Sequence, residues 1–370
     1  MRILQLAPLW ESVPPPAYGG TEAVVHLLTE ELVRMGHDVT LVASGDSLTA
    51  ARLAPVFPRS LRRADDLADR NPYDWAHIAH AIDLSRCGFD VVHNHAGELA
   101  MAMAPLAGAP MLTTTHCLTT ADTRFIWRRY RGAYNTISRS QRAHFDQVGT
   151  GARFMGHVYN AIDVASYPFQ REKGEDLLFL SRLAPEKGPH LAIAVAKRLG
   201  MRLILAGKVD RFDRDFFEEV VRDQIDGEQI VFVGEADARR KRDLYRNARC
   251  LLMPLTWEEP FGLVMPEAMA CGTPVIALRR GSAPELIVHG ETGFVVDTVD
   301  EMADAVLDLG RIDPARCRDH VQAEFSVERM ARAYLRLYEA LSEPLREATI
   351  PVEFTVPRSP AYDDDGVAVA

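Results

Sequence analysis

The amino-acid sequence predicts an α/β fold of two domains, each built on a doubly wound parallel sheet. Short apolar segments with the composition of strands alternate along the chain with helical segments of about 10 to 15 residues. The alternation restarts beyond residue 160, and 370 residues are too many for one ordinary core. Alternating strands and helices favour parallel pairing, because each helix returns the chain to the edge where the next strand begins.

The first unit comprises a strand at residues 2–7, a loop rich in proline and glycine at 14–20, a helix at 21–35 and a strand at 38–43. Apolar residues recur at helical spacing in the helix. Thr21 suits its N-cap and Gly36 suits its C′ position. Strands at 91–93 and 111–115 continue the first domain, and the more polar residues 50–85 are expected to form helices.

The second half repeats the pattern with strands at 177–180, 203–206, 230–233, 250–253 and 275–278. Pro168 and the polar run at 170–176 indicate a boundary. We therefore expect an N-terminal domain at 1–167 and a C-terminal domain at 168–325. A helix is expected at 326–345, and residues 346–370, which contain several prolines and an acidic cluster, are expected to form an extended tail.

Composition narrows the class of protein. The formal charge of −10 argues against a nucleic-acid-binding protein, which is usually basic. The five cysteines are widely spaced, lack a Cys-x-x-Cys pair and are interpreted as buried thiols of a reducing cytosol. Residues 1–8 are interpreted as a strand rather than a signal peptide, and the apolar run at 99–112 is too short to span a membrane. We expect a cytoplasmic enzyme.

The most informative segment is residues 259–276. Seven residues separate Glu259 from Glu267; a Pro-Phe-Gly turn containing Phe261 lies between them, and a helix is expected to begin at Gly262 and Leu263. A helix N-terminus offers free N–H groups to an anion, and ionised carboxylates accept hydrogen bonds from sugar hydroxyls. The segment therefore suits a nucleotide-sugar. In the alternative interpretation, Glu259 caps the helix and Glu267 is a solvated helix residue.

This segment resembles the Glu-x7-Glu motif of the retaining glycosyltransferases of family 4. The resemblance implies the GT-B fold, in which two Rossmann-like domains face each other across a cleft and the last helix crosses back to the N-terminal domain. It also implies that Glu259 positions the donor sugar, that Glu267 binds the ribose, and that Phe261, Gly262 and Leu263 bind the donor.

Two basic residues, Arg182 and Lys187, follow the strand at 177–180, where doubly wound sheets bind ligands. A forked guanidinium and a compact ammonium together suit a pyrophosphate, although basic loop residues are commonly only surface charges. The pattern Arg-x4-Lys-Gly resembles the pyrophosphate-binding pair of the family. We predict that both cations stabilise the leaving phosphate.

The first loop carries Gly19 and Gly20 before a helix and lacks a dinucleotide-binding Gly-x-Gly-x-x-Gly. It resembles the family's Gly-Gly pair, which closes over the donor phosphates. His116 ends the strand at 111–115 and resembles the family's strand-end histidine that contacts the donor sugar; a lone histidine there is more often structural. Gly234 and Glu235 match the edge where the base is expected.

Three further positions match the family near the acceptor side. They are His93 at a strand end, Ser138, and Asn160 in an Asn-Ala-Ile-Asp segment with Ala161 where the family has glycine. His93 and His95 share a strand face, but without a third ligand they do not predict a metal.

Two acidic sites are not expected to take part in the reaction. The Asp-x-Asp pattern at 213–215 is interpreted as part of a solvated helix face. Glu285 is interpreted as a helix cap.

The predicted reaction is transfer of a sugar from a nucleoside diphosphate to an unknown acceptor, with retention at the anomeric carbon and without metal or other cofactor. UDP-glucose is the first guess, and the context is glycan, glycolipid or glycoside biosynthesis. The alternatives are a GT-B sugar-nucleotide epimerase and a non-catalytic regulator that binds nucleotide-sugars. The sequence leaves the acceptor and the oligomeric state open.

A basic stretch without an acidic residue lies at 124–142. It could contact an anionic membrane surface, or it could be a solvated helix face. Its basic and aromatic residues are Arg124, Phe125, Trp127, Arg128, Arg129, Tyr130, Arg131, Tyr134, Arg139 and Arg142.

Overall fold

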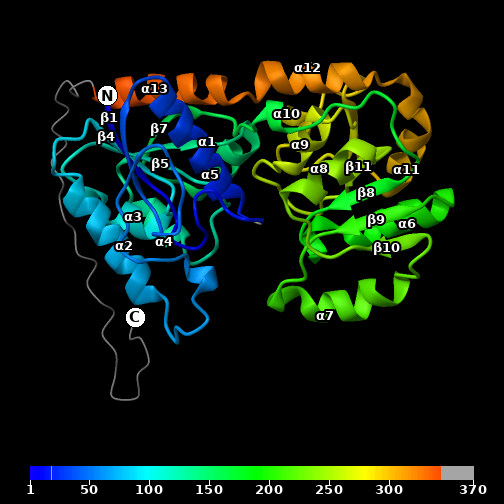
Figure 1. Ribbon diagram of the computed structural model, residues 1–370, viewed down its shortest axis with the longest axis horizontal. Coiled ribbons are helices and arrows are strands. Elements are labelled where there is room, and N and C mark those ends of the chain that lie inside the picture. Colours follow the sequence, from blue (N-terminus) through cyan, green and yellow to red (C-terminus); the bar gives the residue numbers. More distant parts are fainter. Residues whose placement is uncertain (18, 343–370) are drawn as a thin grey trace, which may run out of the picture.

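The computed structural model describes residues 1–17 and 19–342. Within these residues the chain forms two parallel sheets side by side, each flanked by helices (Figure 1). The predicted tail at 346–370 and the end of the predicted last helix lie outside the described residues. No helix in the described ranges is long and apolar enough to cross a membrane.

The N-terminal sheet has seven strands among the described residues, in the order β3-β2-β1-β4-β5-β6-β7. The strands are β1 (Arg2–Leu6), β2 (Asp38–Val42), β3 (Arg52–Leu53), β4 (Val91–Asn94), β5 (Met111–Thr114), β6 (Ala133–Thr136) and β7 (Arg153–His157). The helices are α1 (Gly20–Arg34), α2 (Asn71–Leu84), α3 (Glu98–Met103), α4 (Arg124–Arg129) and α5 (Arg139–Val148).

Helix α1 shows how the sequence directs this domain. Val24, Val25, Leu28 and Leu32 recur at helical spacing and are buried against the sheet. Gly36 follows the helix with φ of 87°, and its N–H bonds to the carbonyl of Val33, as its predicted C′ position requires. The predicted Thr21 cap is wrong, because the N-cap is Gly19 and has no side-chain bond.

The C-terminal sheet has six strands in the described part of the chain, in the order β10-β9-β8-β11-β12-β13. The strands are β8 (Leu177–Leu180), β9 (Leu203–Ala206), β10 (Ile230–Phe232), β11 (Cys250–Met253), β12 (Val275–Leu278) and β13 (Gly293–Val296). The helices are α6 (Pro189–Leu199), α7 (Arg214–Phe216), α8 (Ala238–Asn247), α9 (Val264–Ala270), α10 (Ala283–Leu286), α11 (Val299–Leu307), α12 (Pro314–Glu324) and α13 (Val327–Ser342).

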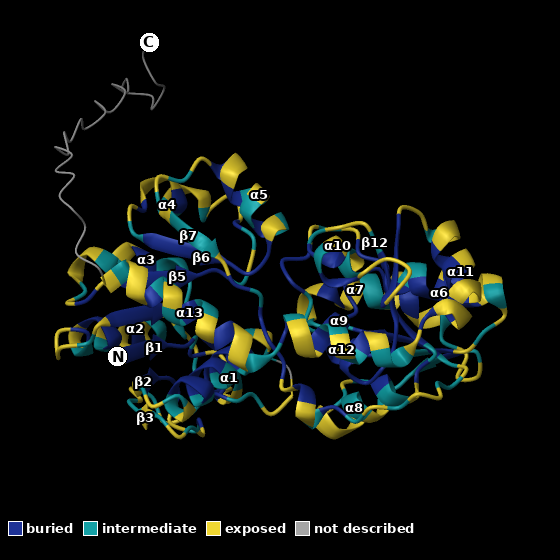
Figure 2. Ribbon diagram, turned by 90° about the horizontal axis from the view of Figure 1, so that it is seen from above, coloured by how far each residue is buried: buried dark blue, intermediate teal, exposed yellow. Residues whose placement is uncertain are grey.

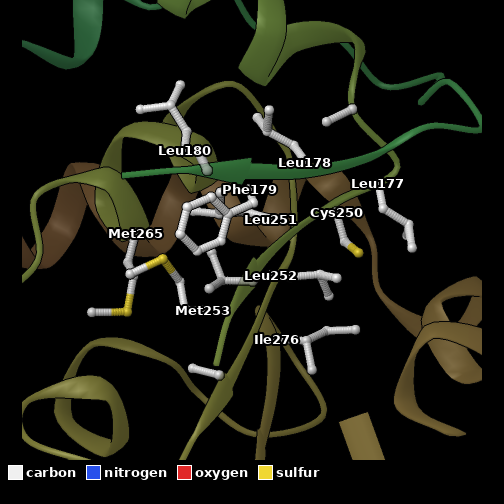
Figure 3. Close-up of a cluster of buried hydrophobic side chains, with 14 of the residues drawn as sticks. Leu177, Leu178, Phe179, Leu180, Cys250, Leu251, Leu252, Met253, Met265 and Ile276 are labelled. Atoms are coloured by element: carbon white, nitrogen blue, oxygen red, sulfur yellow. The ribbon is translucent and has the colours of Figure 1, made fainter. Parts of the chain in front are cut away.

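The central strands of this sheet are buried on both faces, so each is a continuous apolar run. Figure 3 shows Phe179 of β8 packed beside Leu251 of β11, with Met265 of α9 at the same cluster. Figure 2 shows buried strands in both sheets and exposed residues on outer helices such as α8 and α11. Because Met265 is held in the core, the start of α9 is fixed against the sheet.

The last two helices span both halves of the molecule. In Figure 1, α12 runs along the C-terminal half and α13 continues along the N-terminal half. Met330, Tyr334 and Tyr338 of α13 are buried in one cluster with Ile3 of β1 and Leu28 of α1. Helix α13, the last helix of the described residues, therefore packs into the core of the N-terminal domain.

Candidate active site

Many of the predicted functional residues, among them Arg182, Lys187 and Glu259, follow strands at their carboxyl ends, the edge where parallel sheets bind ligands. The two domains meet at this edge. A Cβ atom added to Gly20 would lie 3.4 Å from Cδ1 of Leu263 in the other domain. Arg62, in a short helix at Leu61–Arg63, lies 3.8 Å from Oε1 of Glu235. The candidate site is therefore formed by both domains.

Lys187 and Glu259 form an ion pair at this edge, with side chains only 14% and 10% exposed. The indole Nε1–H of Trp257 donates to the same carboxylate oxygen, Oε2, at 3.1 Å. The ammonium of Lys187 also lies 4.6 Å from the Trp257 ring centroid. Glu259 therefore does not cap α9, and within the described residues its Oε1 has no hydrogen-bond partner.

Arg182 follows β8 and is held by two carboxylates, Glu186 and Asp213. The Asp213 contact is 3.1 Å, and Asp213 is only 8% exposed. Burial raises the pKa of Asp213, and the charge of Arg182 opposes that rise. The prediction that the 213–215 pattern is a solvated helix face is wrong for Asp213. The neighbouring charged residues gave no indication of its partner, Arg182, which lies 31 positions earlier in the sequence.

The turn before α9 exposes backbone donors. Gly262 has φ of 79°, and a Cβ atom there would lie 2.7 Å from Cε of Met265, so the position requires glycine. The N–H groups of Gly262 and Leu263 have no partner in the part of the chain that the structure describes. Phe261 is 2% exposed and packs against Tyr159 and Phe325, so its ring anchors the turn, and its part in donor binding stays a prediction.

Glu267 is buried in α9 and is not a solvated helix residue. Its Oε1 accepts hydrogen bonds from Tyr167 (2.9 Å) and Lys241 (2.7 Å), and its Oε2 accepts one from Tyr245 (2.8 Å). Burial and this carboxylate raise the pKa values of both tyrosines, which therefore remain donors at neutral pH. A carboxylate has about four acceptor positions, so one remains beyond these three contacts.

His116 lies just beyond β5, and its Nε2 is 2.9 Å from Nδ1 of His95. Burial lowers the pKa of His116 to about 4, so the ring is neutral near pH 7. His93 is fully buried, and both of its ring nitrogens bond within the domain, to Tyr338 and Thr114. The prediction that His93 contacts an acceptor is therefore not supported by its position.

The other predicted positions differ in what they do. Ser138 is fully buried and caps α5 by accepting the N–H of Gln141, so it too has a structural role. Asn160 is 3% exposed, and its Oδ1 has no partner among the described residues. Gly19 and Gly234 both have positive φ, and each lies in a loop at the shared edge.

Several residues of the site were not predicted. Trp257, Lys241 and Tyr245 hold the two glutamates, and no local pattern marks them. Glu22, in the first turn of α1, is only 5% exposed, and burial raises its pKa. Its place directly after Gly-Gly-Thr was the only available signal.

Glu285 connects the two domains. Its carboxylate accepts the N–H groups of Arg139 (2.8 Å) and Ser140 (2.7 Å) at the start of α5, and the hydroxyl of Tyr159 (2.9 Å). Glu285 is thus a helix cap, as predicted, but it caps a helix of the other domain. A carboxylate at a helix N-terminus is favoured by the helix dipole.

The thiols partly depart from the prediction. Cys250, Cys271 and Cys317 are buried as expected, whereas Cys87 and Cys117 are exposed. No group of histidine, cysteine or acidic side chains in residues 1–17 and 19–342 could hold a metal ion.

Two parallel-sheet domains that share an edge carrying paired cations and carboxylates define a class, the GT-B glycosyltransferases. Comparison with protein families gives the same class. Residues 167–318 match the model of the glycosyl transferases group 1, and residues 18–165 match that of glycosyltransferase family 4. The chain belongs to this family and is a glycosyltransferase, so the predicted family and fold class are confirmed.

Similar proteins act on different acceptors. The chain is 28% identical to a glycogen synthase of Mycobacterium tuberculosis, over 79% of this chain and 81% of that protein. It is 26% identical to a phosphatidyl-myo-inositol mannosyltransferase of Mycolicibacterium smegmatis, over 92% and 94%. A glycosyltransferase of avilamycin A biosynthesis superposes with a TM-score of 0.67 at 25% identity, covering 92% and 98% of the two chains.

Proposed function

We propose that this protein is a retaining, metal-independent glycosyltransferase that takes a sugar from a nucleoside diphosphate, with UDP-glucose as the first donor to test. The observation that supports this proposal most strongly is the pair of largely buried cations after β8. Lys187 binds Glu259, whose side chain lies against the Gly262 turn with its free N–H groups, and Arg182 follows β8 at the same ligand-binding edge.

These groups suit the charge that develops during the reaction. When the bond from the anomeric carbon to the phosphate oxygen breaks, negative charge grows on the leaving phosphate. Arg182, Lys187 and the two N–H groups would stabilise it without a metal ion. In the described structure both cations are paired with carboxylates, so a diphosphate would compete with Glu186, Asp213 and Glu259 for them.

Glu259 and Glu267 would then position the donor. Displacement of Lys187 toward phosphate leaves Trp257 on Oε2 of Glu259, which keeps the carboxylate oriented while Oε1 and the second acceptor position of Oε2 accept sugar hydroxyls. Glu267 is already fixed by three donors and offers its remaining acceptor position to the ribose. We assign no side chain as a nucleophile of a double displacement, which fits a front-face route to retention.

The test is thermal unfolding with UDP, GDP, ADP and their sugar conjugates. A ligand at 100 times its Kd stabilises the folded state by about 2.7 kcal/mol. A response to one nucleoside diphosphate, followed by transfer or hydrolysis that EDTA does not inhibit, supports the proposal. Binding without turnover favours the non-catalytic regulator, an epimerised sugar nucleotide favours the epimerase, and no response to any ligand contradicts the donor site.

We also propose that α4 contacts an anionic membrane surface. Phe125 is 60% exposed, and the guanidinium of Arg129 stacks 3.9 Å from its ring centroid. Trp127, Tyr130 and Tyr134 are buried in the domain core, so of the predicted aromatic residues only Phe125 remains for this contact. Arg128 and Arg131 beside it are exposed.

A further inference from the structure

A chain of buried polar side chains connects the core of the N-terminal domain to His116. Its members come from four neighbouring strands or their ends and from α13, and they are Gln5, His93, His95, Thr114, Asn135, Tyr334 and Tyr338, none of them more than 4% exposed. Buried polar groups are costly unless their donors and acceptors match. The hydrogen-bond directions along this chain are therefore determined by its geometry.

The direction is set first at Thr114. The amide nitrogen of Asn135 faces the carbonyl of Thr136 and the hydroxyl of Tyr334, so its Oδ1 faces Thr114. The hydroxyl of Thr114 therefore donates its single proton to Oδ1 of Asn135 at 2.6 Å. Thr114 can therefore only accept from Nε2 of His93, which is 2.6 Å away. His93 carries its proton on Nε2, and its Nδ1 is an acceptor.

Two acceptors then face Nε2 of His95. Tyr338 donates to Nδ1 of His93 at 2.6 Å and accepts from the amide nitrogen of Gln5 at 3.2 Å. This orients Oε1 of Gln5 toward Nε2 of His95 at 3.1 Å, and Nδ1 of His93 lies 3.2 Å from the same atom. His95 must therefore carry its proton on Nε2.

The chain ends at His116. Nδ1 of His95 is left as an acceptor, so Nε2 of His116, 2.9 Å away, must donate to it. Nδ1 of His116 then holds a lone pair and has no hydrogen-bond partner among the described residues. His116 follows β5 at the carboxyl edge of the sheet, and the charges of Lys187 and Glu259 act on the thiol of the next residue, Cys117, so this end of the chain lies near the candidate site.

We propose that His95 is a positioning residue that keeps Nδ1 of His116 unprotonated, so that His116 accepts a hydrogen bond from a hydroxyl of the donor sugar. This inference rests on the proposed function and adds a rule of donor specificity. A donor with a hydroxyl at the contacted carbon is preferred over the analogue with hydrogen or fluorine there, because only the hydroxyl can donate. Burial lowers the pKa values of all three histidines, which keeps each ring neutral.

The first experiment measures the tautomer directly. In the full chain with ¹⁵N-labelled histidine and no ligand, long-range ¹H–¹⁵N spectra should show His116 protonated at Nε2, with the resonance assigned through the variant His116→Asn. Protonation at Nδ1 would overturn the inference. This readout needs no turnover, so it stands even if the proposed function fails.

The second experiment compares His95→Leu, which has no acceptor, with His95→Asn, whose amide oxygen replaces Nδ1. His95→Leu should lose the fixed tautomer and roughly tenfold in kcat/KM for the hydroxylated donor, the worth of about one hydrogen bond, with little loss for the deoxy donor. His95→Asn should restore most of the preference. Equal losses for both donors, or an unchanged tautomer in His95→Leu, would contradict the role of His95.

Tyr130→Phe is the matched control. Tyr130 is buried in the same domain, and its hydroxyl bonds to Thr113 and to the carbonyl of Ala133, outside the chain that leads from Asn135 to His116. This variant should lower stability and leave both the tautomer and the preference between donors unchanged. If it abolishes that preference, general loosening of the core explains the effect and the inference is wrong.

Discussion

Replacement of Lys187 by alanine tests the charge stabilisation most sharply. The side chain of Lys187 is 14% exposed, and its partner Glu259 is 10% exposed. Removing one preorganised electrostatic group from a site of this kind lowers kcat by about 10²–10³, or roughly 3–4 kcal/mol of barrier. We expect a loss of this size in Lys187→Ala.

The loss must be separated from damage to folding. Without Lys187, the mostly buried Glu259 is unpaired, and breaking such a pair costs about 3–5 kcal/mol of stability. The assay therefore combines release of nucleoside diphosphate with urea unfolding. The double variant Lys187→Ala, Glu259→Gln should recover stability but not kcat.

Lys197→Ala is the control, because Lys197 is exposed on α6 and bonds only to Gln224 among the described residues. It should keep wild-type kcat. Near-full turnover by Lys187→Ala would refute the reasoning.

Three further predictions follow from the described contacts. Burial lowers the pKa of His116 from 6.5 to about 4, so between these pH values the unfolded chain binds more protons than the folded chain. The free energy of unfolding should therefore fall by about 3 kcal/mol as the pH falls from 6.5 to below 4. Urea unfolding at pH 7 and pH 4.5 would detect part of this loss, and a stability independent of pH would contradict the prediction. Glu285→Gln should weaken the contact between the domains and increase the radius of gyration of the ligand-free protein in X-ray scattering, whereas Glu291→Gln, on the surface of the same domain, should not. Arg128→Glu with Phe125→Ala should reduce sedimentation with vesicles containing anionic lipid, and equal binding to neutral vesicles would argue against the membrane contact.

The fold could be predicted where the signal is local. The strands at 177–180, 203–206, 250–253 and 275–278 match β8, β9, β11 and β12 residue for residue, because strands buried on both faces are continuous apolar runs. Strand β6 was missed because Asn135 and Thr136 are polar. Asn135 is buried beneath α13, where Tyr334 bonds to it across 199 positions of sequence, a contact that no local pattern indicates.

The same limit applies to the site. Lys187 and Glu259 form an ion pair, Arg182 is instead held by Glu186 and Asp213, and the catalytic roles of all three stay predictions. Asp213 was mistaken for a surface charge, since its partner Arg182 is distant in sequence. His93 and Ser138 were expected on the acceptor side, and each is instead buried in structural contacts that only the assembled domain reveals. Phe261 is also buried, and its donor-binding role stays a prediction.

The most direct test of the central claim is the configuration of the sugar that the enzyme releases. The purified chain is incubated with an α-linked sugar nucleotide that stabilises it, and hydrolysis is followed by ¹H NMR faster than the free sugar mutarotates. Retaining transfer assisted by Arg182 and Lys187 predicts that the α anomer appears first, and that Lys187→Ala slows its appearance by about 10²–10³. First appearance of the β anomer, or a rate that does not depend on Lys187, would contradict the account.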